Sequence, residues 1–344
     1  MSGTAVLRIL SVGPGTTLQD GGRQGYLRYG ITAAGPMDRL AHATANGAVG
    51  SGPEVTAIEV SLGGIEVTAE GAPLTVAVAG GAFAVSLGGQ ALVPNVALTL
   101  EPGAVLKVRA GAAGAWCYLA VAGDLAVPPV LGSTATHSRS GIGGLDGRAL
   151  QAGDGLPVRP RPITALPPSR IAAPWLDRDL DRVRILLGPQ ADYFDAEALA
   201  AFLATSWTVS TRNDRMACFL DGPAVRHAKG HDIVSDGIAM GAIQVPGDGR
   251  PIVLMADRQP TGGYPKIATV IGPDLGRLAQ MRPGSRFRFT AVSLEEAVAA
   301  RRAEAALPFS APTLEPVVRT HFTSEFLLSL NLIDGVYGQS CGQY

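Results

Sequence analysis

The sequence predicts a mainly β protein with a few helices, built as barrels or sandwiches at roughly one per half of the chain. Among its 344 residues, 44 are glycine and 25 are proline, which supplies the many turns that short strands need. Charged residues reach only 17%, too few for solvated helices or a disordered chain, whereas 47% hydrophobic residues are ample for a core. Between the glycine, proline and aspartate turns, most segments have strand length, about four to seven residues.

The uncharged segment 71–100 is the place where a membrane helix would first be suspected. It is interrupted by Pro73, Pro94 and several glycines, and its apolar residues alternate as they do in strands. A spanning helix needs about 20 predominantly apolar residues without such breaks. We therefore predict core strands here and no membrane association.

The N-terminal segment and the cysteines indicate a cytoplasmic protein. Residues 1–10 lack the charged-then-apolar pattern of a signal peptide. Cys117, Cys218 and Cys341 are far apart and odd in number, so they form neither a CxxC pair nor a disulfide framework. This cysteine usage fits a reducing compartment.

Three segments have helical patterns. Residues 38–49 are expected to form a short helix capped by Asp38, and 192–204 carries apolar residues at helical spacing. A third helix is expected to begin at Ser293, which forms a capping-box pattern with Glu296. The remaining chain is interpreted as strands and turns.

The segment 157–174 is a candidate linker, because it holds six prolines and no periodic apolar face. Two similar landmarks lie on each side of it, in the same order. The first is Arg-Ile-Leu followed by Gly-Pro, at 8–14 and again at 184–189. The second is a Pro-Gly turn that leads into a strand, at 101–110 and again at 282–291. This repeat predicts a duplicated unit. We expect a first barrel over 1–156, the proline-rich linker at 157–174, a second barrel over 175–306, and a tail of unknown role at 307–344.

Several common chemistries have no signature in this sequence. The net charge of −1 gives no general attraction to nucleic acid or anionic lipid. No GxxxxGK[ST] phosphate loop, strand-to-helix GxGxxG or GxSxG nucleophile motif is present. His227 and His231 have ligand-like spacing, but Gly230 breaks that helix and no third ligand is evident, so we predict no metal site. No lysine adjoins a methionine as in a biotin-attachment site, so no covalent biotin is expected.

Polar side chains gather in four segments, three of which contain glycines that let a ligand approach the backbone closely. The candidate residues are Gln19, Asp20, Arg23 and Asp38 in the first half, and Asp214, Arg215, Ser235, Gln244, Thr261, Gly262, Gly263 and Tyr264 in the second. An arginine beside an aspartate can hold a planar carboxylate or carbonyl through its guanidinium fork. A backbone nest at 261–264 can bind an anion.

Three of the four segments also have a purely structural alternative. Asp20 and Arg23 would pair to pin a loop, and Asp214 and Arg215 would form a structural ion pair. At the 261–264 segment, Tyr264 would plug the end of a barrel beside a wide hairpin. The residues alone leave these alternatives open.

The motifs follow one another in a specific order. They are TTLQDGGRQGY at 16–26, GITAAGPMD at 30–38, GPQADYF at 188–194, NDRM at 213–216, DIVSDG at 232–237, GAIQVP at 241–246 and TGGYPKIATVI at 261–271. In this order the sequence resembles the KipA family, whose members include the C subunit of bacterial three-component 5-oxoprolinase. The family is also called allophanate hydrolase subunit 2 or biotin-dependent carboxyltransferase, and the resemblance covers about residues 6–297.

The resemblance implies two tandem cyclophilin-like β-barrels and a KipI-like partner that completes the catalytic unit. In relatives, such modules move a carboxyl group from carboxybiotin to urea, or activate the lactam of 5-oxoproline with ATP before hydrolysis is finished by a third hydrolase subunit. We therefore expect the C subunit of an ATP-dependent 5-oxoprolinase, acting on a small amide or lactam with ATP, with or without Mg²⁺. The alternatives are a carboxyltransferase component and a non-enzymatic antagonist that binds a KipI-like kinase inhibitor.

The resemblance also guides the roles of the candidate residues. Arg215 would hold a carboxylate or amide oxygen, and Asp214 would orient that guanidinium. Asp20 and Arg23 would act from the opposite wall, together with Gln19. The substrate- or nucleotide-binding set would be completed by Asp38, Ser235, Gln244, Thr261, Gly262, Gly263 and Tyr264.

Overall fold

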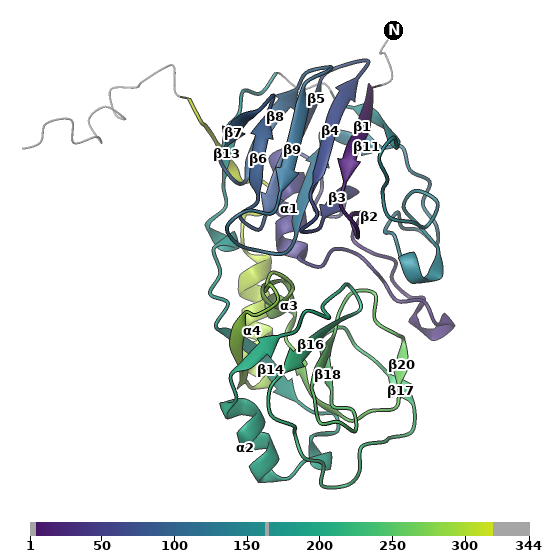
Figure 1. The fold of residues 1–344 in the computed structure, drawn as a ribbon, viewed down its shortest axis with the longest axis vertical. Helices are drawn as coiled ribbons and strands as arrows, with labels where there is room; N and C mark the ends of the chain where they lie inside the picture. Colours follow the sequence, from purple (N-terminus) through teal and green to yellow (C-terminus); the bar gives the residue numbers. More distant parts are fainter. Residues whose placement is uncertain (1–4, 162–164, 319–344) are drawn as a thin grey trace, which may run out of the picture.

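The computed structural model describes residues 5–161 and 165–318, which form two β-rich halves with helices between them (Figure 1). The predicted mainly β class with few helices is confirmed. The segment 71–100 forms strands, as its alternation predicts. Most of the predicted tail, including Cys341, lies outside the described residues.

The first half consists of two seven-stranded sheets packed face to face. One sheet has the order β11 (Gly123–Leu125), β12 (Gly155–Pro160), β1 (Ala5–Val12), β4 (Ile65–Glu70), β9 (Val105–Arg109), β6 (Ala84–Leu87) and β7 (Gln90–Leu92). The other has the order β2 (Thr17–Gln19), β3 (Ala57–Val60), β10 (Cys117–Val121), β5 (Leu74–Gly80), β8 (Val96–Leu100), β13 (Ser169–Ala172) and β23 (Thr313–Pro316). Leu7 and Val67 from the first sheet share one apolar core with Val78 and Leu98 from the second.

The first half is thus a sandwich and not the closed barrel that the resemblance implies. The outermost strands of the two sheets, β11 and β7 in one and β2 and β23 in the other, pair on one side only. Strand β13 pairs with β8, and β23 then pairs with β13, so the second sheet grows outward at this edge instead of closing.

The proline-rich segment contributes strands to both sheets of the sandwich. It contains most of β12 and all of β13, while residues 313–316 of the predicted tail form β23. Pro160 ends β12 and Pro168 directly precedes β13, two places where a missing N–H costs little. The predicted domain limits at 156, 174 and 306 stay a prediction.

The second half contains a closed seven-stranded barrel, as predicted. Its order is β14 (Arg182–Leu187), β21 (Lys266–Val270), β18 (Ala242–Gln244), β19 (Ile252–Leu254), β16 (Ala217–Asp221), β15 (Trp207–Val209) and β22 (Arg286–Ala291). Strands β14 and β22 close it by pairing in parallel. A separate two-stranded ribbon joins β17 (Asp236–Gly237) to β20 (Thr261–Gly262).

Both landmarks of the predicted repeat form strands, but these strands have different neighbours in the two halves. The first landmark forms β1 and β14, and the second forms β9 and β22. In the first half β4 lies between β1 and β9, whereas β14 pairs directly with β22 in the second. The matching segments therefore share secondary structure without sharing sheet order.

Three of the helices were expected from sequence patterns. Helix α1 (Arg39–Ala48) follows the predicted Asp38 cap, α2 (Ala196–Ala204) begins after an Asp195 cap, and α4 (Leu294–Ala305) has the predicted capping box. Helix α3 (Gly272–Ala279) has no strong sequence signal, because its glycines and proline lower helix propensity. Short 3-10 turns are η1 (Leu27–Tyr29), η2 (Ser138–Ser140), η3 (Pro174–Leu176) and η4 (Ala191–Tyr193).

Helix α1 packs against β5 and β10 and places His42 in the protein interior. The two ring nitrogens of His42 lie 3.1 Å from the carbonyl oxygens of Pro53 and Gln19. Burial lowers the pKa of His42 to about 4, although both carbonyls oppose that shift. The imidazole is therefore neutral in the folded protein near pH 7.

Lowering the pH from 7 to 5 is expected to destabilise the protein through His42 by about 2 kcal/mol. The unfolded chain binds a proton at His42 in this range, while the folded chain, with its lowered pKa, does not. The check is urea unfolding at both pH values for wild type and H42Q. The pH dependence should be weaker in H42Q but unchanged in H231Q, whose imidazole is exposed. Equal pH dependence in H42Q and wild type would contradict this assignment.

Candidate functional site

A groove of about 630 Å³ lies between the two halves of the chain. Leu62, Trp116 and Arg139 line it from the first half, and the loop 213–216 with Asp257 lines it from the second. We call this the junction groove. Two of the predicted catalytic residues lie in its 213–216 loop.

Arg215 lies buried at the groove and divides its donors among three groups. Its Nε and Nη2 donate to the two carboxylate oxygens of Asp257 at 2.9 and 2.8 Å. Nη2 also donates to the carbonyl of Gly35 at 2.8 Å, and Nη1 donates to Glu59. Burial by itself lowers the pKa of Arg215, but Asp257 and Glu59 outweigh burial and raise it. Since Gly35 and Glu59 belong to the first half, Arg215 ties the halves together.

Glu59 extends this contact into the first half. It is fully buried on β3, and its Oε2 accepts hydrogen bonds from Met37 N at 2.8 Å and Tyr118 Oη at 2.7 Å. Burial raises the pKa of Glu59, against the opposing effect of Arg215. Tyr118 Oη in turn accepts from the backbone N–H of Asp38 at 2.8 Å. An unbroken chain of polar contacts therefore runs from the groove to the start of α1.

Asp38 ends this chain with a second ion pair. Its carboxylate accepts from Arg178, from Gln280 Nε2 at 2.8 Å and from Ala41 N at 3.3 Å. Burial would raise the pKa of Asp38, but Arg178 and Gln280 outweigh burial and lower it. Gln280 Oε1 accepts from Trp116 N at 3.1 Å, which returns the chain to the groove wall. We call this set the junction network: Asp257, Arg215, Glu59, Tyr118, Asp38, Arg178 and Gln280.

Asp214 has a local role in the same loop. Its Oδ1 accepts from Met216 N at 2.8 Å and from Ala217 N at 3.0 Å, which fixes the turn that carries Arg215. Within the part of the chain that the structure describes, Asp214 forms no ion pair with Arg215. The proposed Asp214–Arg215 pair is therefore replaced by pairs of Arg215 with Asp257 and Glu59.

Asp20 and Arg23 hold one loop of the first half without pairing with each other in the described residues. Asp20 accepts from Ser133 Oγ at 2.6 Å and from Thr134 N at 2.7 Å. Arg23 Nη2 donates to Ala135 O at 2.6 Å, while Nη1 is buried with no partner among the described residues. Burial lowers the pKa of Arg23, although Asp20 opposes this. The predicted Asp20–Arg23 pair is therefore absent among the described residues, and each side chain holds the loop through its own contacts.

Gln19 connects this loop to Arg215. It is fully buried, donates to Thr136 O at 3.1 Å and accepts from Gly35 N at 3.1 Å. Because Gly35 O accepts from Arg215, the structure brings Gln19 and Arg215 to opposite sides of one peptide segment. Gln19 therefore supports the segment that Arg215 contacts, but none of Gln19, Asp20 and Arg23 lines the junction groove as the opposite wall.

The remaining predicted residues lie around the β17–β20 ribbon and do not line the junction groove. Gln244 Nε2 donates to Tyr264 O at 3.4 Å, and the Tyr264 ring is 41% exposed instead of plugging the barrel. The buried Lys266 donates to Asp236 Oδ2 at 2.8 Å, beside the exposed Ser235. This ribbon also carries the predicted Thr261 and Gly262, and Gly263 follows directly after it.

Residues 29–291 match the family described as "Carboxyltransferase domain, subdomain A and B". The chain belongs to this carboxyltransferase domain family. The matched range includes the junction network, since it begins before Asp38 and ends after Gln280.

Known relatives place this carboxyltransferase domain chain more narrowly. It is 37% identical over 297 residues to the C subunit of the Escherichia coli 5-oxoprolinase, a match that covers 86% of this chain and 94% of that protein. It is 38% identical over 298 residues to the C subunit of the Haemophilus influenzae 5-oxoprolinase, with the same coverage. The chain is thus a homologue of the 5-oxoprolinase C subunit.

A more distant relation connects the carboxyltransferase domain chain to a much larger protein. The crystal structure of the K. lactis urea amidolyase matches it with a TM-score of 0.80 at 27% identity. The match covers 87% of this chain and 19% of the urea amidolyase. The fold therefore corresponds to one region of that enzyme.

Sequence reasoning misses most partners in the junction network. Glu59 has a usable signal, because it is the charged residue in the otherwise apolar strand β3. Asp257 follows the apolar strand β19 by only a few residues, a place where polar site residues often stand. Tyr118 and Gln280 have no comparable signal.

The described residues also bear on metal and membrane predictions. Among residues 5–161 and 165–318, no group of three or more His, Cys, Asp or Glu is placed to hold a metal ion. No helix in these ranges is both long and apolar enough to cross a membrane. Cys117 and Cys218 are buried free thiols, and burial raises the pKa of both.

Proposed function

We propose that this chain acts as the C subunit of an ATP-dependent 5-oxoprolinase, together with a KipI-like partner and a third hydrolase subunit. The observation that carries the proposal is the 37% identity to the C subunit of the E. coli 5-oxoprolinase, across 94% of that protein. The relation to urea amidolyase supports the same general chemistry, since both names describe enzymes of small amides or lactams.

The junction groove is the proposed substrate site. Its volume of about 630 Å³ lies in the range of small-molecule pockets, and Trp116 and Met281 give it apolar walls for a compact ring. Arg139 lines the groove with no carboxylate partner among the described residues, so it is suited to a substrate carboxylate. The Asn213 amide can donate and accept at once, which matches the N–H and C=O of a lactam.

The other predicted residues take supporting roles in this proposal. Arg215 acts as a positioning residue, because its donors already serve Asp257, Glu59 and Gly35. Asp214 shapes the loop that presents Asn213. ATP, with or without Mg²⁺, would bind with the help of the KipI-like partner, since the sequence has no phosphate loop of its own.

We also infer that the closed barrel is the cyclophilin-like unit that the family resemblance implies, and its seven-strand closure supports this. The separated, buried cysteines support a cytoplasmic location, where thiols stay reduced.

Mixing the chain with its partner proteins and ATP is expected to consume 5-oxoproline. R139A should lower kcat/KM at least about tenfold, because it removes a charged hydrogen-bond donor to the substrate carboxylate. R286A is the matched control, since Arg286 is exposed on β22 outside the groove. The measurement is 5-oxoproline loss with and without ATP. Consumption that is absent in every mixture would overturn the proposal, and equal rates for R139A and R286A would overturn the site.

A carboxyltransferase role is the second candidate, favoured by the TM-score of 0.80 with urea amidolyase. Supplying the complex with a separate carrier whose carboxybiotin is labelled on the carboxyl group would transfer that label to urea or a related amide and leave free biotin on the carrier. Label in the product, without ATP use by this chain and its partner, would select this role. Tight partner binding without turnover of any amide would select the non-enzymatic antagonist instead.

A further inference from the structure

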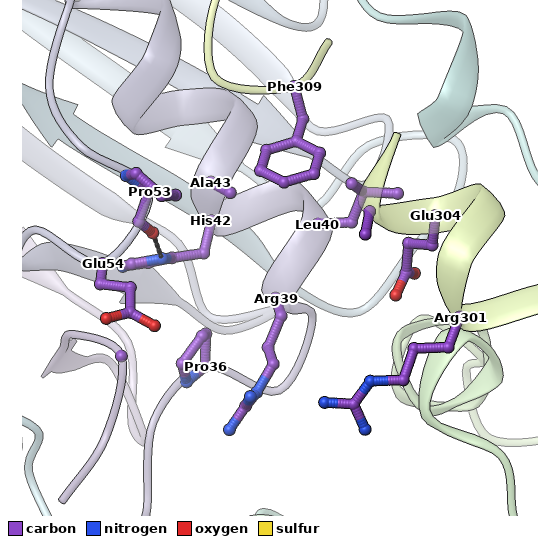
Figure 2. A pocket seen from close by; sticks show the side chains of 12 residues that line it. Pro36, Arg39, Leu40, His42, Ala43, Pro53, Glu54, Arg301, Glu304 and Phe309 are labelled. Carbon is purple, nitrogen blue, oxygen red and sulfur yellow. Dashed lines mark hydrogen bonds between the residues drawn. The ribbon is translucent and has the colours of Figure 1, made fainter. Parts of the chain in front are cut away.

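A second cavity lies beside α1, away from the junction groove. Its volume is about 420 Å³, and it is bounded by α1, by the loop at residues 53–54 and by α4 with the segment that follows it. Figure 2 shows Arg39 from α1 and Arg301 from α4 directed toward the same space, with Phe309 on the far side. We call this the α1–α4 pocket.

The α1–α4 pocket is surrounded by four charged side chains, two of each sign. Arg39 and Arg301 are the cations, and Glu54 and Glu304 are the anions. Among the residues that the structure describes, none of the four forms an ion pair or a side-chain hydrogen bond. Figure 2 shows Glu304 pointing into the space near Arg301 while Glu54 lies on the opposite side, near Pro36.

Both signs of charge share one concave space in the α1–α4 pocket, where Glu304 is half-buried and the other three charged side chains are exposed. Here both signs line one cavity and remain apart, which leaves donors and acceptors available to a ligand that carries both charges. Burial raises the pKa of Glu304, and a ligand cation beside it would favour its ionised form.

The pocket also has an apolar wall. Leu40 and Ala43 are buried on α1, and Phe309 is half-buried above them. Such a wall suits an aliphatic side chain of a few carbons, which would contribute through the burial of apolar surface. The charged groups would then fix its orientation.

We propose that the α1–α4 pocket binds a zwitterionic α-amino acid with an aliphatic side chain. Arg39 and Arg301 bind its carboxylate, and Glu304, which lies near Arg301, binds its ammonium group. A phosphorylated ligand fits less well, because both glutamates would repel the added negative charge. The proposal does not depend on the 5-oxoprolinase assignment, since it concerns a separate cavity and is tested by binding alone.

The test is calorimetric titration of the full chain with L-leucine, isocaproate and isoamylamine. Isocaproate lacks the ammonium group and isoamylamine lacks the carboxylate, so each removes one half of the recognition. L-leucine is expected to bind saturably, and each analogue at least about tenfold more weakly. R301A and E304Q should each weaken L-leucine binding by a similar factor.

R302A provides the matched control, because Arg302 is the exposed neighbour of Arg301 on α4 and does not line the pocket. It should bind L-leucine as the wild type does. No saturable binding of L-leucine would overturn the proposal. It would also be overturned if isocaproate bound as tightly as L-leucine, or if R301A and E304Q both bound with wild-type affinity.

Discussion

Replacing Arg215 by alanine is expected to lower the free energy of unfolding by about 3–5 kcal/mol. The substitution leaves Glu59 and Asp257 buried without the cation that both carboxylates contact. An ion that is taken out of water costs several kcal/mol unless a partner compensates it. The loss should be larger than for a typical point substitution, which costs roughly 1 kcal/mol.

Urea unfolding of R215A and of R226A at neutral pH separates this effect from the loss of any arginine. Arg226 pairs with Glu197 at 2.8 Å, but both side chains are largely exposed, so R226A should change stability little. R215K should fall between the two, because lysine keeps the charge without the fork. Equal stability of R215A and R226A would show that the network around Arg215 is not the main link between the halves.

The strands and helix caps are the part of the fold that local sequence specifies. Asp38 and Ser293 stand where a cap is needed, and both caps form. The alternation of apolar residues over 71–100 likewise specifies strands. Successive side chains of a strand point to opposite faces, so this two-residue period is visible in the local sequence. Sheet order is different: whether β9 pairs with β4 or with β1 depends on long-range contacts that no short pattern encodes.

The site shows the same division between local and long-range information. Arg215 is prominent in sequence because it lies in the polar run 210–215, and Asp38 because it follows Gly35-Pro36 and precedes a helical pattern. Their partners are Glu59, which lies in a buried strand, and Gln280, which follows α3. Arg215 and Glu59 are 156 residues apart, so their ion pair cannot be deduced from sequence spacing. The sequence identifies Arg215, whereas its partner becomes evident only in the folded structure.

Replacing Asp38 by alanine is the second large effect that the junction network predicts. Asp38 is fully buried and caps α1, but it also pairs with Arg178 and accepts from Gln280 at 2.8 Å. D38A removes all three contacts and leaves the guanidinium of Arg178, whose side chain is 13% exposed, without its carboxylate. We expect a loss of about 3–5 kcal/mol in the free energy of unfolding.

A second aspartate cap separates the two contributions in this prediction. Asp195 caps α2 in the same way, accepting from Ala198 N at 2.7 Å, but it forms no ion pair among the described residues. D195A should therefore cost only about 1 kcal/mol, the usual value of a lost helix cap. The difference between D38A and D195A measures what the pair with Arg178 and the bond from Gln280 add. If both variants lost the same stability in urea, Asp38 would act as a cap alone, and Arg215 would remain the one ion-pair link from the barrel to the sandwich within residues 5–161 and 165–318.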